Sequence, residues 1–227
     1  LCSYLCTDGK PIDESSLYDR KNPFKNRDPR CSYTIVEFNS DYFGFNYTPH
    51  PDSSKCWNYN TRTFVTNKDS KAGDQYASYN GLILRKGIDS DWSDNLEAEN
   101  DKLIMRYADV LLMYAEAKIE LNQIDQSVLD AMNMVRARAY KVDFRTGNYP
   151  KITETSQAAL RTILRTERRM EFAFEGLRYN DILRWRIAEK VMNYPNYGLP
   201  TSVALCKTYY KSGYWFIPGV PDIDENG

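Results

Sequence analysis

The sequence predicts a mainly α protein in which tetratricopeptide-like helical hairpins pack against a loop-rich region with short strands. Three observations support this fold class. Apolar residues recur at helical spacing in the second half, small alanines lie where two helices would cross, and the first hundred residues show little periodicity and many Asn, Asp, Ser, Tyr and Pro residues. We expect a loop-rich region with short strands over residues 1–100 and a helical scaffold over 101–227, together forming one compact unit.

Composition and charge narrow the class of protein. The 227 residues are 42% hydrophobic and 14% aromatic, which excludes disorder. The formal net charge is -1, so no overall field attracts nucleic acid or an anionic membrane. No apolar run reaches the roughly 18 to 20 residues that span a bilayer. We therefore expect no nucleic-acid partner and no membrane-spanning helix.

The loop-rich region contains three candidate strands and many turn signals. The candidates are Tyr33–Phe38, Thr61–Val65 and Leu82–Arg85. So much irregular chain in a folded protein usually covers a rigid scaffold and presents a surface. We expect residues 1–100 to form the ligand-facing surface.

A helical hairpin is predicted over residues 106–139. The first helix should end near Asn122, and Ser127 should cap the second, with Asp130 in its first turn. The apolar stripe of the first helix consists of Ala108, Leu111, Leu112, Ala115 and Ile119. Helices joined by so short a link pack antiparallel, and about 34 residues is the length of one tetratricopeptide repeat.

Two further helices are predicted, over Thr155–Glu175 and Tyr179–Val191, with Gly176 ending the first of them. Glutamates repeat at i+4 beside the apolar stripe and alternate with arginines, which predicts half-buried ion pairs. The residues expected to form structural ion pairs are Glu167, Glu171, Glu175, Arg168, Arg178 and Arg184.

Catalysis is disfavoured by the residue types present. Paired glutamates occur in glycosidases, with carboxyls roughly 5 to 10 Å apart, but here neighbouring arginines should hold the glutamates ionised. The single histidine, His50, and the lack of a Gly-x-Ser-x-Gly motif leave a nucleophile without an obvious base. Five scattered cysteines offer no tight ligand spacing for zinc. We expect no enzyme activity, no metal and no cofactor.

Aromatic residues point instead to ligand binding. Eighteen tyrosines and four tryptophans supply rings that stack on the apolar face of a sugar, while neighbouring Asn and Asp groups bond its hydroxyls. The candidate ligand-binding residues are Tyr42, Tyr47, Trp57, Tyr59 and Trp92. Two stacked rings and a few hydrogen bonds correspond to an affinity of about millimolar to tens of micromolar, which suits capture and handover.

Four ordered blocks of sequence resemble SusD/RagB-like proteins, and the resemblance extends over nearly the whole chain. The blocks are Cys6–Ile12 with Asn22–Arg30, Arg106–Ala117, Glu167–Trp185 and Phe216–Asp224. The chain resembles roughly the C-terminal half of such a protein, without the secretion signal, the lipid-anchoring cysteine and the early helices of the family.

The resemblance implies a glycan-capturing lipoprotein on the extracellular face of the outer membrane of Bacteroidetes. It would bind oligosaccharide or polysaccharide and act as a lid on a SusC-like TonB-dependent transporter, with the membrane reached only through a lipid anchor absent from this chain. Two alternatives stay open. The same scaffold could bind a peptide or another nutrient, or the hairpin could be a tetratricopeptide-like protein-interaction module.

Overall fold

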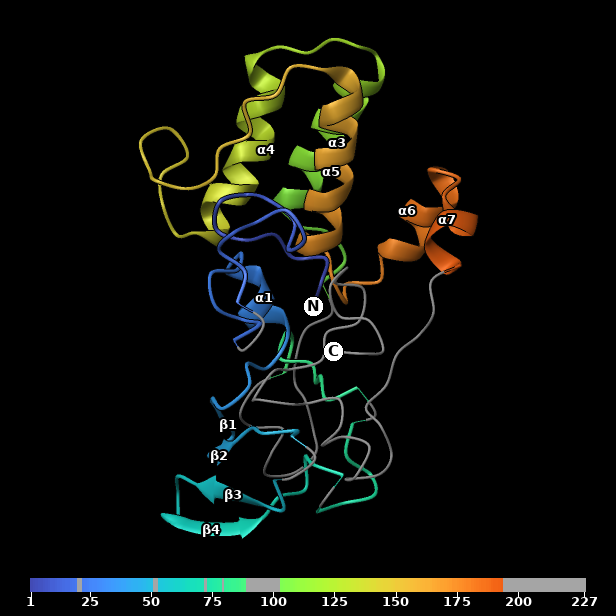
Figure 1. Ribbon diagram of the computed structural model, residues 1–227. Coiled ribbons are helices and arrows are strands. Elements are labelled where there is room, and N and C mark those ends of the chain that lie inside the picture. The colour runs from blue at the N-terminus through green and yellow to red at the C-terminus, as the bar shows by residue number, and fades with distance from the viewer. Residues whose placement is uncertain (20–21, 51–52, 72, 79, 89–102, 194–227) are drawn as a thin grey trace. The chain divides into compact units, whose positions relative to one another are not determined.

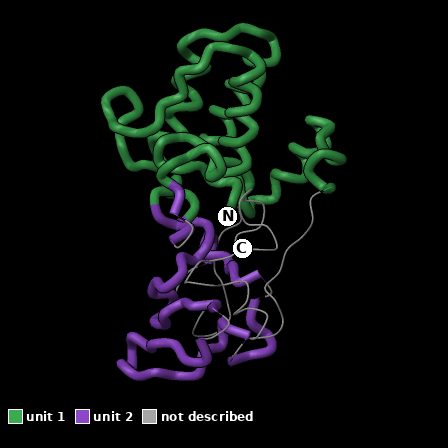
Figure 2. Tube along the Cα trace, in the orientation of Figure 1, with its two compact units in different colours: residues 1–17, 26–31, 101–193 green, residues 18–25, 32–100, 194–227 purple. Residues whose placement is uncertain are grey.

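The structure is a computed structural model that describes residues 1–19, 22–50, 53–71, 73–78, 80–88 and 103–193 (Figure 1). The described chain divides into two compact units (Figure 2). Unit 1 contains the described residues of 1–17, 26–31 and 101–193, and unit 2 those of 18–25 and 32–100. The chain is mainly helical with one small sheet, as the sequence predicts. That the two regions form one compact body stays a prediction.

Unit 1 is built on three helices that contact one another, α3, α4 and α5 (Figure 1). Helix α3 spans Tyr107–Glu120, α4 spans Gln126–Ala139 and α5 spans Gln157–Glu171. Their shared core consists of Ala108, Leu112, Ala115, Ile119, Val128, Ala131, Met132, Val135, Ile152, Leu160, Leu164 and Phe172. The predicted hairpin of α3 and α4 is confirmed.

Local hydrogen bonds explain where the hairpin turns. After α3, the amide of Gln123 donates to the Lys118 carbonyl and the amide of Asn122 to that of Ile119, while Asn122 has a φ of 53°. These are the bonds of a Schellman motif. The cap of α4 is Asp125, whose carboxylate accepts from the Ser127 amide at 3.0 Å. The prediction of Ser127 as the cap was wrong by two residues, because an aspartate precedes it.

The C-terminal helices are shorter than predicted. Helix α5 ends at Glu171 instead of Glu175, and Phe174 adopts a left-handed conformation with a φ of 62°. Gly176, with a φ of 81°, therefore lies in the connection rather than at the helix end. The predicted helix over Tyr179–Val191 is two helices, α6 (Arg178–Arg184) and α7 (Ala188–Met192). Arg186, in the left-handed region with a φ of 53°, separates them.

Unit 2 contains an antiparallel sheet in the order β1-β2-β3-β4. The strands are β1 (Asp41–Tyr42), β2 (Phe45–Asn46), β3 (Lys55–Asn58) and β4 (Thr63–Thr66). Phe43 and Gly44, with φ values of 52° and 80°, form the two-residue turn between β1 and β2. Two positive φ values are the requirement of a type I′ turn, which matches the twist of the flanking strands.

The three predicted strands are confirmed to different extents. Thr61–Val65 overlaps β4, whereas Leu82–Arg85 contributes only a single bridge, between Leu84 and Ile35. The prediction of a strand over Tyr33–Phe38 was wrong at its start, because helix α1 spans Arg30–Thr34. The Asp28 carboxylate accepts from the Arg30 amide at 3.0 Å, which favours a helical turn here.

Within the described residues, no helix has both the length and the apolar character needed to cross a membrane.

Candidate ligand-binding surface

One face of the sheet in unit 2 carries exposed aromatic rings. Trp57 of β3 is paired with Phe64 of β4, so both side chains project from the same face. Their ring centroids lie 5.1 Å apart at an interplanar angle of 70°, an edge-to-face arrangement. Phe64 is 67% exposed. An exposed ring held in place by a neighbouring ring is suited to stacking against a flat apolar ligand surface.

Polar groups accompany these rings. Asn46 of β2 projects from the same face as Trp57, because its neighbour Phe45 pairs with Asn58 on the other face. The Asn46 side-chain amide donates to the hydroxyl of Tyr59 at 3.3 Å, and Tyr59 is 40% exposed. We call Asn46, Trp57, Tyr59 and Phe64 the aromatic face. It combines ring surfaces with an amide and a phenol that can bond to sugar hydroxyls.

The opposite face of the sheet is hollowed. A cavity of about 500 Å³ lies there, within the size range of small-molecule sites. Its lining residues are Phe45, Cys56, Asn58, Val65, Thr66, Lys68 and Asp69.

The other predicted ligand-binding residues lie in different surroundings. Tyr42 is half-buried, and its hydroxyl donates to the Leu84 carbonyl at 3.1 Å. Tyr47 is 1% exposed, its hydroxyl donates to the Gly81 carbonyl at 2.7 Å, and burial raises its pKa. Trp92 lies outside the described residues. Of the four predicted residues that the structure describes, Trp57 and Tyr59 thus lie on the aromatic face, and Tyr42 and Tyr47 do not.

Phe64 was missed by the sequence analysis. It lies within the predicted strand Thr61–Val65, so its place opposite Trp57 follows once the hairpin register is known. The four residues between Asn58 and its partner Thr63 form the loop. Asn58 fixes that loop, since its side-chain oxygen accepts from the amides of Asn60 and Thr61 at 2.9 and 3.0 Å. Asparagine side chains commonly cap turns in this way.

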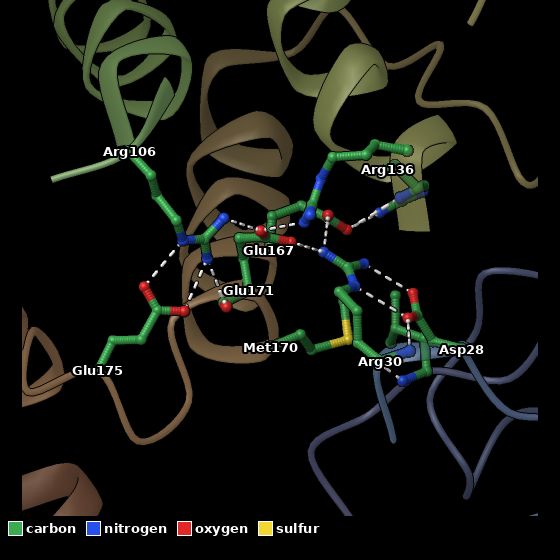
Figure 3. A network of polar contacts seen from close by, with 10 residues as sticks. Asp28, Arg30, Arg106, Arg136, Glu167, Met170, Glu171 and Glu175 are labelled. Carbon is green, nitrogen blue, oxygen red and sulfur yellow. Dashed lines mark hydrogen bonds and ion pairs between the residues drawn. The ribbon is translucent and has the colours of Figure 1, made fainter. Parts of the chain in front are cut away.

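The predicted ion-pair residues of α5 lie in a buried network in unit 1 (Figure 3). Leu160, Leu164, Glu167 and Glu171 follow one another at spacings of four, three and four residues, so the apolar stripe of α5 continues into two glutamates. Glu167 is 0% and Glu171 2% exposed. Arg136 of α4 donates to Glu167 at 2.9 Å through Nε.

Arg30 connects the N-terminal segment to the same glutamates. It donates to Glu167 at 3.1 Å and to Glu171 at 3.2 Å, and it binds Asp28 through two bonds of 2.8 and 2.6 Å. Burial by itself lowers the pKa of Arg30, but the charges of Glu167, Asp28 and Glu171 outweigh burial and raise it well above its ordinary value. Arg30 therefore stays charged in the interior.

Two more groups of ion pairs complete the network. Arg106, before α3, binds Glu175 through two bonds of 2.8 Å and also binds Glu171, to which Arg138 donates as well. Arg168 binds Asp109 at 3.0 Å and Asp181 at 3.0 Å.

The last helices attach through Arg184 and Trp185. Arg184 binds Glu116 of α3 and Asp181, and the indole of Trp185 donates to Glu116 at 2.7 Å. Arg178 has no ion-pair partner among the described residues, and burial lowers its pKa. Each carboxylate described above for the network thus faces a guanidinium, an arrangement that fits a structural role, whereas Arg178 is not part of it.

Among the described residues, no group of three or more His, Cys, Asp or Glu side chains could hold a metal ion.

Known proteins show related sequences and folds. A profile of the SusD family matches residues 1–216. SusD-like protein P25 of Formosa agariphila is 26% identical over 188 residues, which are 82% of this chain and 29% of that protein. SusD-like protein P2 of the same organism is 35% identical over 123 residues, 54% of this chain and 22% of that protein.

Two solved structures from Bacteroides fragilis have a similar fold. One, a SusD-like carbohydrate-binding protein, has a TM-score of 0.70 and 36% identity, covering 92% of this chain and 39% of that one. The other, a SusD-like protein, has a TM-score of 0.56 and 25% identity, covering 83% and 35%. The chain thus spans less than half the length of each of these proteins. Since the family profile matches nearly all of its residues, the chain belongs to the SusD family.

Proposed function

We propose that this chain is part of a non-catalytic, cell-surface protein that binds oligosaccharide and passes it to a SusC-like TonB-dependent transporter. The aromatic face carries this proposal, because the paired rings of Trp57 and Phe64 offer stacking surfaces beside the polar tips of Tyr59 and Asn46. The similarity to a solved SusD-like carbohydrate-binding protein supports it. We assign the buried glutamates, each bonded to arginines, a structural role and not one in acid–base catalysis.

The affinity expected from such a face is weak. Each stacked ring contributes about 0.5 to 1.5 kcal/mol and each net hydrogen bond about 1 kcal/mol, so Kd falls between about millimolar and tens of micromolar. Weak capture suits a protein that releases its ligand to a neighbour. Tethering beside a transporter raises the effective ligand concentration and makes weak sites useful.

Calorimetric titration tests the carbohydrate proposal. The intact protein would be titrated with maltohexaose, cellohexaose, xylohexaose, laminarin and mannan, and separately with a tripeptide panel. We expect at least one carbohydrate to bind, and Trp57→Ala and Phe64→Ala each to weaken it about threefold to tenfold. Tyr76→Ala is the control, because Tyr76 is 86% exposed and lies outside the aromatic face. Heat from peptides alone would favour the peptide alternative.

The transporter and the cell-surface location have their own test. The full-length tagged protein, purified from outer membranes of the native cell, should carry a TonB-dependent transporter with it. It should also be cleaved by protease added to intact cells. Recovery without the transporter, or protection from the protease, would contradict this part of the proposal.

A second candidate function rests on α3. Tyr107, Val110, Tyr114 and Leu121 are exposed and follow one another at spacings of three, four and seven residues, so they share one helix face. An exposed apolar stripe of this kind is typical of a protein-binding helix. This stripe supports the alternative of a protein-interaction module. If that alternative holds, Tyr114→Asp should abolish binding of a protein partner and leave carbohydrate affinity unchanged.

A further inference from the structure

The hollow behind the aromatic face is formed by the sheet itself. The cross-strand pairs Phe45–Asn58 and Cys56–Val65 put these four side chains on one face. After β4 the chain continues through Lys68 and Asp69, which close the same cavity of about 500 Å³. We call this cavity the Asp69 pocket. Its shape thus follows from strand register and not from a single mobile side chain.

The carboxylate of Asp69 has no partner within the part of the chain that the structure describes. Among the described residues no group donates a hydrogen bond to it or pairs with it; only its backbone amide is bonded, to the side-chain oxygen of Asn67 at 3.0 Å. Burial raises the pKa of Asp69, because the site is partly removed from water. A half-buried carboxylate that no described protein group bonds is available to accept hydrogen bonds from a ligand.

The titratable side chains near Asp69 other than Lys68 are neutral, and the two tyrosines among them are bonded elsewhere. Burial, together with the charge of Asp69, raises the pKa values of Tyr47 and Cys56, so both remain uncharged near neutral pH. The same holds for Tyr42. The tyrosine hydroxyls donate to the carbonyls of Leu84 and Gly81 and so cannot serve the carboxylate. Of the described residues that line the pocket, Lys68 is the one cation; it is exposed, and no described group pairs with it.

The pocket therefore presents a defined set of groups to a ligand. The Asp69 carboxylate only accepts, whereas the Lys68 ammonium and the Asn58 amide can donate. Phe45, 38% exposed, supplies a ring. A lone carboxylate is too few ligands for a divalent cation, and it would repel an anionic ligand. Two adjacent hydroxyls on a flat, neutral ring meet these requirements.

We propose that the Asp69 pocket is a second carbohydrate subsite, which holds one neutral sugar unit whose adjacent hydroxyls donate to the two oxygens of the Asp69 carboxylate. The proposal rests on the carbohydrate-binding function proposed above and adds a site on the other face of the sheet. It also specifies the ligand class. A uronic acid or sulfated unit is disfavoured at this position, because its negative charge would meet that of Asp69.

The test compares Asp69→Asn with Asp74→Asn in the intact protein, using the oligosaccharide of the neutral panel that binds best. Asp74 is the control, because it lies in the same unit but its carboxylate already accepts from the Tyr76 amide at 2.7 Å. We expect Asp69→Asn to weaken binding about tenfold or more, since hydrogen bonds to a charged group are strong, and Asp74→Asn to leave it unchanged. Thermal unfolding at pH 7 should show Asp69→Asn to be at least as stable as the native protein, so that misfolding does not explain the loss.

Carboxyl NMR of Asp69 gives a second readout that a structural role would not change. A saturating neutral oligosaccharide should lower the pKa of Asp69, because bound hydroxyls stabilise its ionised form. Unchanged affinity of Asp69→Asn, with Trp57→Ala weakened, would overturn the pocket and leave the proposed function standing. Binding of a zwitterionic tripeptide that is lost in Asp69→Asn would also overturn it. Failure of the native protein to bind any carbohydrate would remove both proposals.

Discussion

Single buried charges in unit 1 depend on their partners. Glu167 is fully buried and bonded to Arg136 and Arg30, while Arg30 is also bonded to Asp28 (Figure 3). Taking such ions out of water costs several kcal/mol each, and mutual attraction offsets this only when geometry and hydrogen bonding are good. The set therefore contributes less to net stability than to specifying one arrangement of α4, α5 and the N-terminal segment.

Removal of one partner from this network should be costly. We expect Glu167→Gln to lower the free energy of unfolding by about 3 to 5 kcal/mol, because the buried Arg136 would lose its counter-ion and Arg30 one of its three. Glu120→Gln is the control, since Glu120 pairs with Arg161 at the surface, where a pair contributes about 0 to 1 kcal/mol. Urea unfolding followed by circular dichroism measures both. A loss at Glu167 no larger than that at Glu120 would contradict the network's role.

The cap of α4 should give a pH-dependent contribution. Hydrogen bonds from Lys118 and Ser127 lower the pKa of Asp125 from 3.8 to about 2. A depressed folded-state pKa means that the ionised form stabilises the fold above the unfolded value, and this stability is lost as pH falls through about 2. The native protein should therefore exceed Asp125→Asn in urea midpoint at pH 6, and the gap should shrink between pH 4 and pH 2. A gap independent of pH would exclude the charge as its origin.

Which aromatic residues reach a surface was only partly predictable. Trp57 and Tyr59 were identified from composition and their polar neighbours, but nothing local distinguishes them from Tyr47, which is in the core. Alternation along a strand decides that difference, and strands of two to four residues are too short to show it in sequence. The position of Phe64 on the same face as Trp57 likewise depends on the strand register, which the sequence does not show.

At the scale of elements, helices with a long apolar stripe were predictable and their ends were not. The stripe of α3 and α4 sets the hairpin, whereas α5 ends at Glu171 even though the i+4 repeat of glutamates continues to Glu175. Arg106 binds Glu175 from outside the helix, so tertiary pairing overrides the local pattern. In α1, the Asp28 carboxylate favours a helical turn where side-chain propensity had suggested a strand.

The end of α4 offers a stabilising change. Lys141 follows the helix in the left-handed region with a φ of 57°, and its amide and that of Val142 make the two bonds of a Schellman motif. Lys141→Gly should raise the free energy of unfolding by about 0.5 to 1 kcal/mol, because glycine adopts this conformation without steric cost. Lys141→Ala is the matched control, as it keeps the Cβ and the strain. The free energy of unfolding measured in urea should be higher for Lys141→Gly than for both the native protein and Lys141→Ala.

At the scale of the whole molecule, the helical core and the candidate ligand sites belong to different units. The apolar core described for α3, α4 and α5 belongs to unit 1, while the aromatic face and the Asp69 pocket belong to unit 2. The units are interleaved in sequence, since residues 1–17 and 26–31 join the helices of unit 1. No sequence pattern indicates such interleaving, because it arises from long-range contacts such as those of Arg30.

This division predicts that core stability and ligand affinity can be changed separately. Leu164 is 1% exposed in the core of unit 1, so Leu164→Ala should cost about 2 to 5 kcal/mol through lost burial and a residual cavity. Hydrogen exchange should then speed up in α3, α4 and α5 while oligosaccharide affinity at 20 °C stays within twofold of native. Trp57→Ala should do the reverse, weakening affinity and leaving exchange in these helices unchanged. Affinity that fell in Leu164→Ala as much as in Trp57→Ala would show that the ligand site depends on the helical core and that the two units do not have separate roles.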